Sequence, residues 1–140
     1  MIGGGVVGTH AARMAAGLRA EVAVLEGSIS RIRELDELFE GRIRTRFSTM
    51  DALEEGVFAA DTVIGGVLVP GASAPRLVSR NMLGSMRKGS VIVDVAIDQG
   101  GCFETSRPTT HADPTYEIDG VIHYCVANMP GAVPLASSQA

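Results

Sequence analysis

Short apolar runs rich in β-branched residues alternate along the chain with segments in which apolar residues recur every three or four positions. The first pattern is typical of buried strands and the second of amphipathic helices. Strands are expected at residues 21–26, 42–47, 62–68, 91–96 and 121–127, and helices at residues 9–19, 30–40, 51–58 and 79–86, with Ser30 and Ser79 as N-caps. This alternation predicts an α/β fold with a doubly wound parallel sheet.

The 140 residues fit one domain with one hydrophobic core. The run Val91-Ile92-Val93 is continuously apolar, which favours a strand covered by helices on both faces. Residues 100–120 are polar and contain proline, and we expect them to form a functional or interface loop because connections are usually shorter. The tail, residues 130–140, is expected to start a helix.

A glycine fingerprint opens the chain. Gly3-Gly4-Gly5-Val6-Val7-Gly8 matches G-x-G-x-x-G and runs directly into an alanine-rich helical segment. In this fingerprint Gly3 permits the tight turn, Gly5 lets the backbone approach a pyrophosphate, and Gly8 lets the helix pack closely on a strand. Phosphates then meet the free N–H groups at the helix start. The motif predicts a Rossmann-type site for a dinucleotide.

An acidic residue follows at the spacing that this site needs. Glu26 lies eighteen positions after Gly8 and ends the apolar run Val22-Ala23-Val24-Leu25. A carboxylate at the end of the second strand binds the ribose hydroxyls of NAD and repels the 2′-phosphate of NADP. The sequence therefore predicts NAD as the cofactor. Arg31 and Arg33 weaken this preference, because they would reach a 2′-phosphate if the loop folded back, but arginines on a helix are interpreted as solvated residues.

Ligands of open α/β sheets bind beyond the carboxyl ends of the strands. Asp98 lies just past a central strand and before a glycine pair, where a carboxylate contacts the nicotinamide ribose, orients an amine or water, or caps turn amides. Asp94 competes with it, but a place within the strand favours an interior role. Lys88 precedes the same strand and should lie at the opposite end of the sheet.

Composition excludes several classes of protein. The formal net charge is −4 and no basic run occurs, so nucleic acid is not an expected partner. No apolar run is long enough to cross a bilayer, so we expect no membrane association. Cys102 and Cys125 do not indicate a disulfide framework, which favours the cytoplasm. His10, His111 and His123 form no recognisable zinc pattern with these cysteines, and no metal is predicted.

The stretch VIVDVAIDQGGCFETSRPTTHADPTYEIDGVIHYCVANMPGAVP, residues 91–134, closely resembles bacterial alanine dehydrogenases, as does GGGVVGTHAARMAAGL near the start. The resemblance covers essentially the whole chain. It implies an NAD-dependent, reversible oxidative deamination of L-alanine to pyruvate and ammonia. It also implies a cytoplasmic homo-oligomer, usually a hexamer.

The resemblance further assigns residues. Asp98 matches the family's active-site aspartate, and the family usually has aspartate where this chain has Glu26. The family's substrate-binding lysine and catalytic histidine belong to a preceding domain that is not in this chain. The positions that match NAD contacts are Val6, Glu26, Arg31, Ser48, Val67, Leu68, Val95, Ala96, Ile97, Asp98, Arg107, Val126, Ala127, Asn128 and Met129.

Residues 1–140 are therefore interpreted as a partial NAD-binding Rossmann domain of a larger oxidoreductase. Only Met1 and Ile2 precede the fingerprint where a central strand is expected, so we expect lowered stability, weak or absent NAD binding and no catalysis by the isolated chain. The alternatives are the NAD(H)-binding subunit of a proton-translocating transhydrogenase and a non-catalytic NAD-binding fragment.

Overall fold

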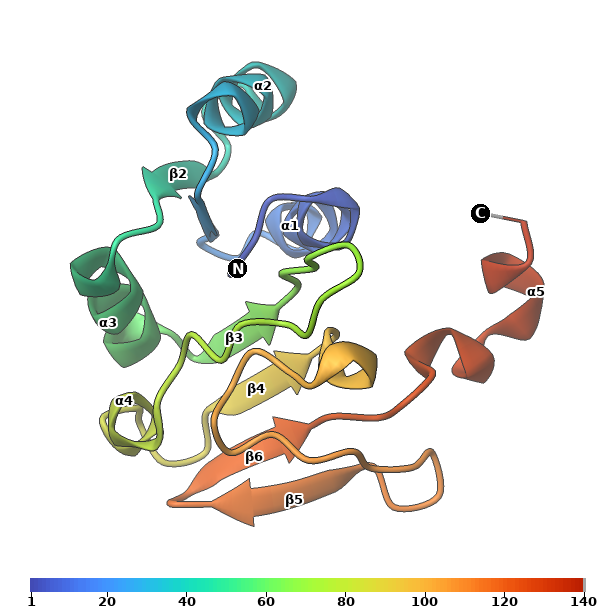
Figure 1. Cartoon of the computed structure of the whole chain (residues 1–140). Coiled ribbons are helices and arrows are strands. Elements are labelled where there is room, and N and C mark those ends of the chain that lie inside the picture. The colour runs from blue at the N-terminus through green and yellow to red at the C-terminus, as the bar shows by residue number, and fades with distance from the viewer. Residues whose placement is uncertain (140) are drawn as a thin grey trace.

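The computed structural model describes residues 1–139, which form helices and strands in the expected alternation (Figure 1). In chain order these are α1 (Val6–Gly17), β1 (Ala23–Glu26), α2 (Ile29–Phe39), β2 (Arg44–Phe47), α3 (Met50–Ala59), β3 (Thr62–Gly65), α4 (Arg80–Gly84), β4 (Val91–Asp94), the 3₁₀ turn η1 (Ile97–Gln99), β5 (Thr115–Ile118), β6 (Val121–Tyr124), the 3₁₀ turn η2 (Met129–Ala132) and α5 (Pro134–Ser137). The α/β fold class is confirmed. Among the residues described, no helix has the length and apolar character needed to cross a membrane.

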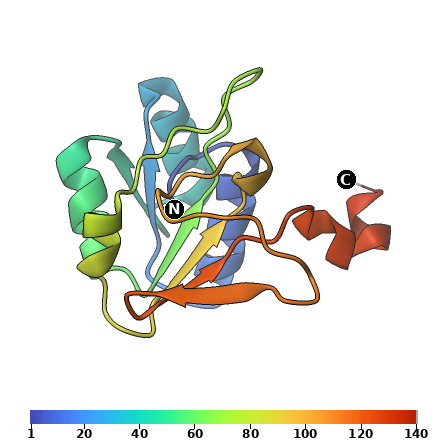
Figure 2. The same cartoon turned by 60° about the horizontal axis from the view of Figure 1, so that its bottom comes forward.

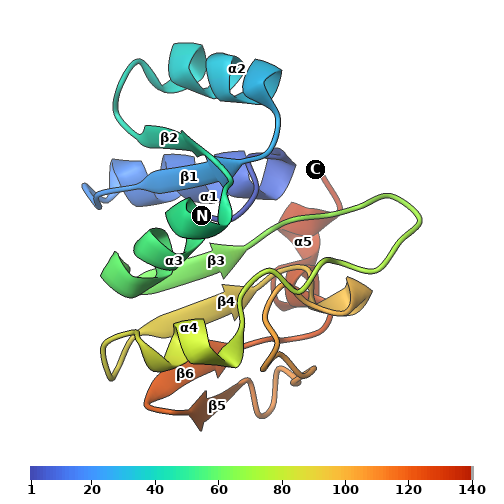
Figure 3. The same ribbon diagram turned by 60° about the vertical axis from the view of Figure 1, so that its left-hand side comes forward.

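The strands lie side by side in the order β2, β1, β3, β4, β6 and β5 (Figure 3). The pairs β1–β2, β3–β4 and β4–β6 are parallel, whereas β5 joins β6 as an antiparallel hairpin. Parallel neighbours need crossover connections. The connection from β1 to β2 contains α2 and that from β3 to β4 contains α4, both in segments where the hydrophobic pattern predicted helices, whereas the connection from β4 to β6 contains η1 and β5. The sheet is therefore a mainly parallel, doubly wound sheet with an antiparallel edge.

Met1 and Ile2 occupy the place of the central strand. Ile2 forms parallel bridges to both Leu25 and Gly65, and it is only 1% exposed. Its N–H donates to Ile64 O and its carbonyl accepts from Gly66 N, both at 2.9 Å, while Leu25 N donates to Met1 O at 2.9 Å. Two residues thus join β1 to β3 in one layer, and the lowered stability expected from so short a strand stays a prediction.

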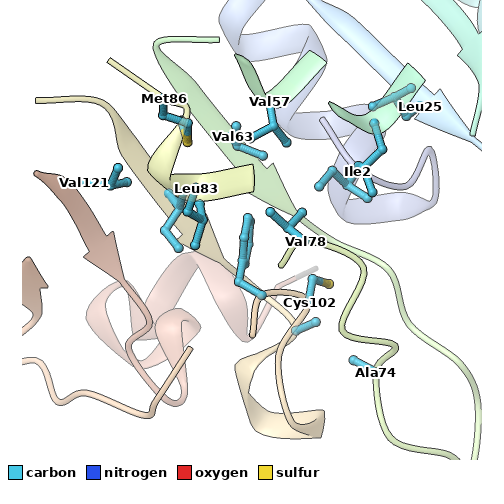
Figure 4. Packing of buried hydrophobic residues seen from close by; sticks show 14 of the residues in the cluster. Ile2, Leu25, Val57, Val63, Ala74, Val78, Leu83, Met86, Cys102 and Val121 are labelled. Carbon is cyan, nitrogen blue, oxygen red and sulfur yellow. The ribbon is translucent and has the colours of Figure 1, made fainter. Parts of the chain in front are cut away.

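Hydrophobic side chains pack on both faces of the sheet. On β1, the side chains of Val24 and Leu25 alternate, as the strand period requires. Val24 packs with Leu35 and Phe39 of α2 and with Ala12 of α1, whereas Leu25 belongs to the cluster formed by α3 and α4. Figure 4 shows the second cluster, and Figure 2 shows α1 on the side of the strands opposite α3 and α4.

The apolar side chains of β4 are less buried than the apolar sequence of this strand predicts. Ile92 is fully buried beneath α4, but Val91 and Val93, which point to the other face, are only half-buried. The C-terminal segment with η2 and α5 stands away from the body of the molecule and leaves part of this face uncovered (Figure 2). The expectation that helices cover both faces of this strand therefore holds fully only for the face that carries Ile92.

Several predicted boundaries also differ. The helix expected at residues 9–19 starts at Val6, because the glycine loop leads into it without a spacer. Ser28, not Ser30, is the N-cap of α2 and accepts from Arg31 N, whereas Ser79 caps α4 as expected. Residues 100–120 contain strand β5, which the polar composition concealed. The expected terminal helix corresponds to α5, and Ala140 lies outside the described residues.

Candidate functional site

A cleft of about 550 Å³ opens where β1, β3 and the glycine loop meet. It lies at the carboxyl ends of the strands, where α/β sheets bind ligands. The sequence-predicted residues that line it are Gly3, Gly5, Val6, Glu26, Ser48, Val67 and Leu68. The fold therefore brings together, in one glycine-loop cleft, residues from four separate segments of the chain.

The glycines of the fingerprint have different surroundings. A Cβ atom on Gly8 would lie 1.9 Å from the carbonyl oxygen of Gly3, so α1 approaches the loop too closely for any side chain there. Gly3 has φ +92°, a conformation that disfavours side chains. A Cβ atom on Gly5 would meet no atom within 4 Å. Gly8 and Gly3 thus shape the loop, while Gly5 leaves open space beside it.

The start of α1 suits an anion. Its N-cap, Gly5, provides no capping side chain, and the first turn contains no acidic residue. The first N–H groups of a helix have no partner within the helix, and the helix dipole places partial positive charge there. A phosphate beside Gly5 would meet both features.

Glu26 lines the cleft and contacts the glycine loop directly. Its Oε2 accepts from the backbone N–H of Gly4 at 2.7 Å, and its Oε1 accepts from Ser28 N at 2.9 Å. Both carboxylate oxygens are therefore fixed by backbone donors at the end of β1. The side chain is half-buried, which leaves the remaining lone pairs accessible from the cleft.

Arg31 is not among the residues that line the cleft. Its Nε donates to Gly4 O at 2.8 Å, and its two terminal nitrogens contact Thr9 Oγ1 at 3.0 Å and Glu34 Oε2 at 2.6 Å. The guanidinium thus ties α2 to the glycine loop. Its role as a direct cofactor contact stays a prediction, and in this arrangement it supports the loop from behind.

Asp98 lies in a second hollow of about 620 Å³, which is lined by Gly71, Ala72, Ser73, Asp98, Gln99 and Gly100. Ala74 N donates to Gln99 O at 2.7 Å, and this bond joins the loop after β3 to the turn after β4. Asn128 N, beyond the end of β6, donates to Asp98 Oδ2 at 3.3 Å. Hydrogen bonds therefore connect the segments that follow β3, β4 and β6, but the predicted single crevice is replaced by two hollows, and no residue that the structure describes beyond β6 lines either of them.

The remaining predicted contacts are placed differently. The side chains of Ala96, Ile97 and Val126 are buried, and those of Val95, Ala127 and Met129 are half-buried. A cofactor contact by the three buried residues would therefore be made by their backbone. The guanidinium of Arg107 lies 3.9 Å from the ring centroid of Tyr116, on the β5 side of the molecule. Arg107 lines neither hollow, and a cofactor contact by it would need a different side-chain position.

Asp94 has the interior role that its position within a strand indicated. It is fully buried, and its carboxylate accepts from Cys102 N at 2.8 Å, from Ala96 N at 3.2 Å and from the Ser106 hydroxyl. Burial raises the pKa of Asp94, and these hydrogen bonds oppose that change. The carboxylate thereby joins both ends of the loop that contains Asp98.

His123 gives a pH-dependent prediction. The ring is fully buried, its Nδ1 donates to Val121 O at 2.8 Å, and its Nε2 accepts from Thr105 Oγ1 at 2.7 Å. Burial lowers the pKa of His123 below its ordinary value of 6.5, so the unfolded chain binds a proton more readily than the folded chain. The free energy of unfolding should therefore fall as pH decreases through 6.5.

Urea unfolding at several pH values between about 7.5 and 5.5 measures this dependence. In His123→Asn the decrease should be smaller, whereas His10→Asn, at an exposed position, should behave as the wild type. Asp94 is present in all three proteins, so its own contribution, which has the opposite sign, cancels in the comparison. Equal slopes for wild type and His123→Asn would contradict the prediction.

Sequence reasoning missed several residues of the glycine-loop cleft. Gly66 lies at the end of β3, and a Cβ atom on it would come within 3.3 Å of Val7 Cγ1, so the strand end packs closely on the glycine loop. The pair Gly65-Gly66 at a strand end was a signal for this close approach. The donors that hold Glu26 are the backbone N–H groups of Gly4 and Ser28, and side-chain types in the sequence do not predict such backbone contacts.

Comparisons with known proteins show the family to which the chain belongs. The chain matches the family described as "Alanine dehydrogenase/PNT, C-terminal domain" over residues 1–140. It is 67% identical over 140 residues to an alanine dehydrogenase of Halomonas elongata, and the match covers 100% of this chain. The chain spans only 38% of the length of that relative.

Solved structures give the same picture. An L-alanine dehydrogenase matches with a TM-score of 0.95 and 53% sequence identity, over 99% of this chain and 38% of that one. A transhydrogenase from Sinorhizobium meliloti matches with a TM-score of 0.85 and 31% identity, over 99% of this chain and 39% of that one. Both matches confirm the fold across nearly the whole chain.

Proposed function

Because the chain belongs to the family of alanine dehydrogenase/PNT C-terminal domains, we propose that it forms the NAD-binding part of an alanine dehydrogenase. The protein would catalyse the reversible oxidative deamination of L-alanine to pyruvate and ammonia. The observation that carries the cofactor assignment is the glycine-loop cleft, which is lined both by Gly5, with open space beside it, and by Glu26, whose carboxylate is held by Gly4 N. One side suits a pyrophosphate and the other suits a ribose diol.

Different residues of the cleft would bind different parts of NAD. The N–H groups at the start of α1 would receive the pyrophosphate, and Glu26 would accept hydrogen bonds from the adenosine ribose. Val67 and Leu68, just beyond β3, would pack beside the adenosine end of the cofactor. A 2′-phosphate would meet the negative charge of Glu26, so NAD should bind in preference to NADP.

Asp98 is the residue that we propose for the reacting end. When bound, NAD supplies the acceptor for the hydride that leaves the amino acid. Asp98 lies in the second hollow, exposed and held by Asn128 N, where its carboxylate would orient the amine of the substrate. The other groups that bind the amino acid would come from the length of the relatives that this chain does not span. A cytoplasmic homo-oligomer, usually a hexamer in this family, is part of the proposal.

The alternative is an NAD(H)-binding subunit of a transhydrogenase, which shares the fold. The lower identity of 31% to the transhydrogenase, against 53% to the L-alanine dehydrogenase structure, favours the first proposal. A third possibility is a module that binds NAD without supporting catalysis. All three functions require the chain to bind NAD or NADH, so a test of cofactor binding examines the part that they share.

A titration of the purified chain with NADH and with NADPH, followed by nicotinamide fluorescence, tests the cofactor assignment. Saturable binding of NADH that is at least about tenfold tighter than that of NADPH is expected from one repulsive charge at the ribose. Ile2 pairs with both Leu25 and Gly65 beside the cleft, so measurable binding of NADH by this chain is expected in place of absent binding. Absence of binding, or equal binding of both cofactors, would overturn the assignment. Alanine-dependent formation of NADH by the chain alone is not expected.

A further inference from the structure

The turn that follows β6 has an unusual conformation and lies next to Asp98. Asn128 adopts the left-handed conformation, with φ 54° and ψ 52°, which non-glycine residues rarely adopt. Its N–H is the group that donates to Asp98 Oδ2, at 3.3 Å. The position of this donor therefore depends on the contacts that keep Asn128 in this conformation, which is uncommon for non-glycine residues although asparagine tolerates it better than most.

His111 supplies one of the contacts that hold Asn128. Its Nε2 lies 2.9 Å from Asn128 O, and because a carbonyl oxygen only accepts, the ring carries a proton on Nε2 and donates. The loop that contains His111 is held by backbone hydrogen bonds to residues 125–127, which directly precede Asn128. Thr109 N donates to Cys125 O at 2.9 Å, and Ala127 N donates to Thr109 O at 3.1 Å, so this loop runs beside the chain just before Asn128.

Gly131 makes room for this arrangement. A Cβ atom at Gly131 would lie 2.8 Å from Asn128 Nδ2 and 3.5 Å from His111 Nε2. The N–H of Gly131 also donates to Asn128 O at 2.9 Å, so this carbonyl accepts from two donors. Three segments that are distant in sequence, at His111, Asn128 and Asp98, are thus connected by successive hydrogen bonds.

We propose that His111 is a positioning residue for Asp98. By donating to Asn128 O, it keeps Asn128 in its left-handed turn and keeps the Asn128 N–H directed at the Asp98 carboxylate. The inference rests on the proposed role of Asp98 at the reacting end of the cofactor, and it adds a residue on a loop that lies outside both hollows. His111 itself makes no contact with either hollow in this arrangement.

Substitutions of different length separate this role from a general effect on the loop. His111→Gln places an amide nitrogen near the position of Nε2 and should preserve the bond, whereas the shorter His111→Asn should lose it. Gly131→Ala should disturb the same turn by a different route. Asp113→Asn, an exposed position in the same loop, is the matched control and should resemble the wild type.

The deciding measurement is the backbone amide resonance of Asn128 in ¹H–¹⁵N NMR spectra of the chain without cofactor. In the wild-type background, Asp98→Asn should shift this resonance, because the carboxylate that accepts from Asn128 N is replaced. In the His111→Asn and Gly131→Ala backgrounds the shift should be much smaller, and in His111→Gln it should return. An equal shift in the His111→Asn background would overturn the proposal.

Binding of NADH provides the second measurement. His111→Asn should weaken the affinity by about fivefold, the effect of losing one hydrogen bond, and His111→Gln should restore it. In an Asp98→Asn background His111→Asn should have no further effect, since coupled residues are not additive. Full additivity would contradict the proposal. If the wild-type chain does not bind NADH, the proposed function fails, and the NMR comparison still decides the role of His111.

Discussion

Gly5→Ala is expected to weaken NADH binding by about 10- to 100-fold, because an added methyl group that overpacks an interface costs about 1–3 kcal/mol. Nothing in the chain lies within 4 Å of where that methyl group would be. Gly5 has φ −69° and ψ −160°, a conformation that alanine adopts without strain. The fold should therefore tolerate the substitution, and only a ligand in the glycine-loop cleft would meet the methyl group.

Thermal unfolding and NADH titration of the same preparation test this prediction. The midpoint of unfolding should change by no more than about 3 °C, as for an exposed substitution without new contacts. Gly8→Ala is the matched comparison, since its Cβ atom would lie 1.9 Å from Gly3 O and must displace the backbone. That variant should lose stability as well as binding. If Gly5→Ala binds NADH as the wild type does, the pyrophosphate does not pass beside Gly5.

The contrast between these glycines shows what the sequence alone was able to predict. The spacing of Gly3, Gly5 and Gly8 predicted which backbone positions pack closely and which would face a ligand, because each role depends on the lack of a side chain. Glu26 was predicted from local sequence too, since it lies eighteen positions after Gly8 and ends an apolar run that predicts a strand. Predictions of this kind depend only on residues that are close in sequence, so they need no information about contacts between distant segments.

Other features of the site depended on contacts between distant segments. Arg31 and Arg107 are long side chains with several possible partners, and the structure pairs them with Gly4 O and the Tyr116 ring. Sequence gave no means of choosing among those partners. Strand β5 was missed because its exposed threonine and glutamate alternate with half-buried residues at the edge of the sheet, where polarity resembles that of a loop.

Glu26→Ala is expected to weaken NADH binding by about 10- to 100-fold, the effect of removing a charged hydrogen-bond partner worth about 1.5–3 kcal/mol. The same substitution should reduce the preference for NADH over NADPH, since the charge that repels a 2′-phosphate disappears. It also leaves the N–H groups of Gly4 and Ser28 without their acceptor, so the glycine loop loses a support. Fluorescence titrations with both cofactors measure the two effects.

Two further variants separate the hydrogen bonds of Glu26 from its charge. Glu26→Gln keeps the shape and one acceptor oxygen but removes the charge, so it should lose discrimination against NADPH more than it loses NADH affinity. Glu26→Asp keeps the charge on a shorter side chain and should retain the preference for NADH. If Glu26→Gln still excludes NADPH as strongly as the wild type, the repulsion arises elsewhere. If Glu26→Ala binds NADH normally, the carboxylate serves only to brace the glycine loop, and the ribose lies away from the end of β1.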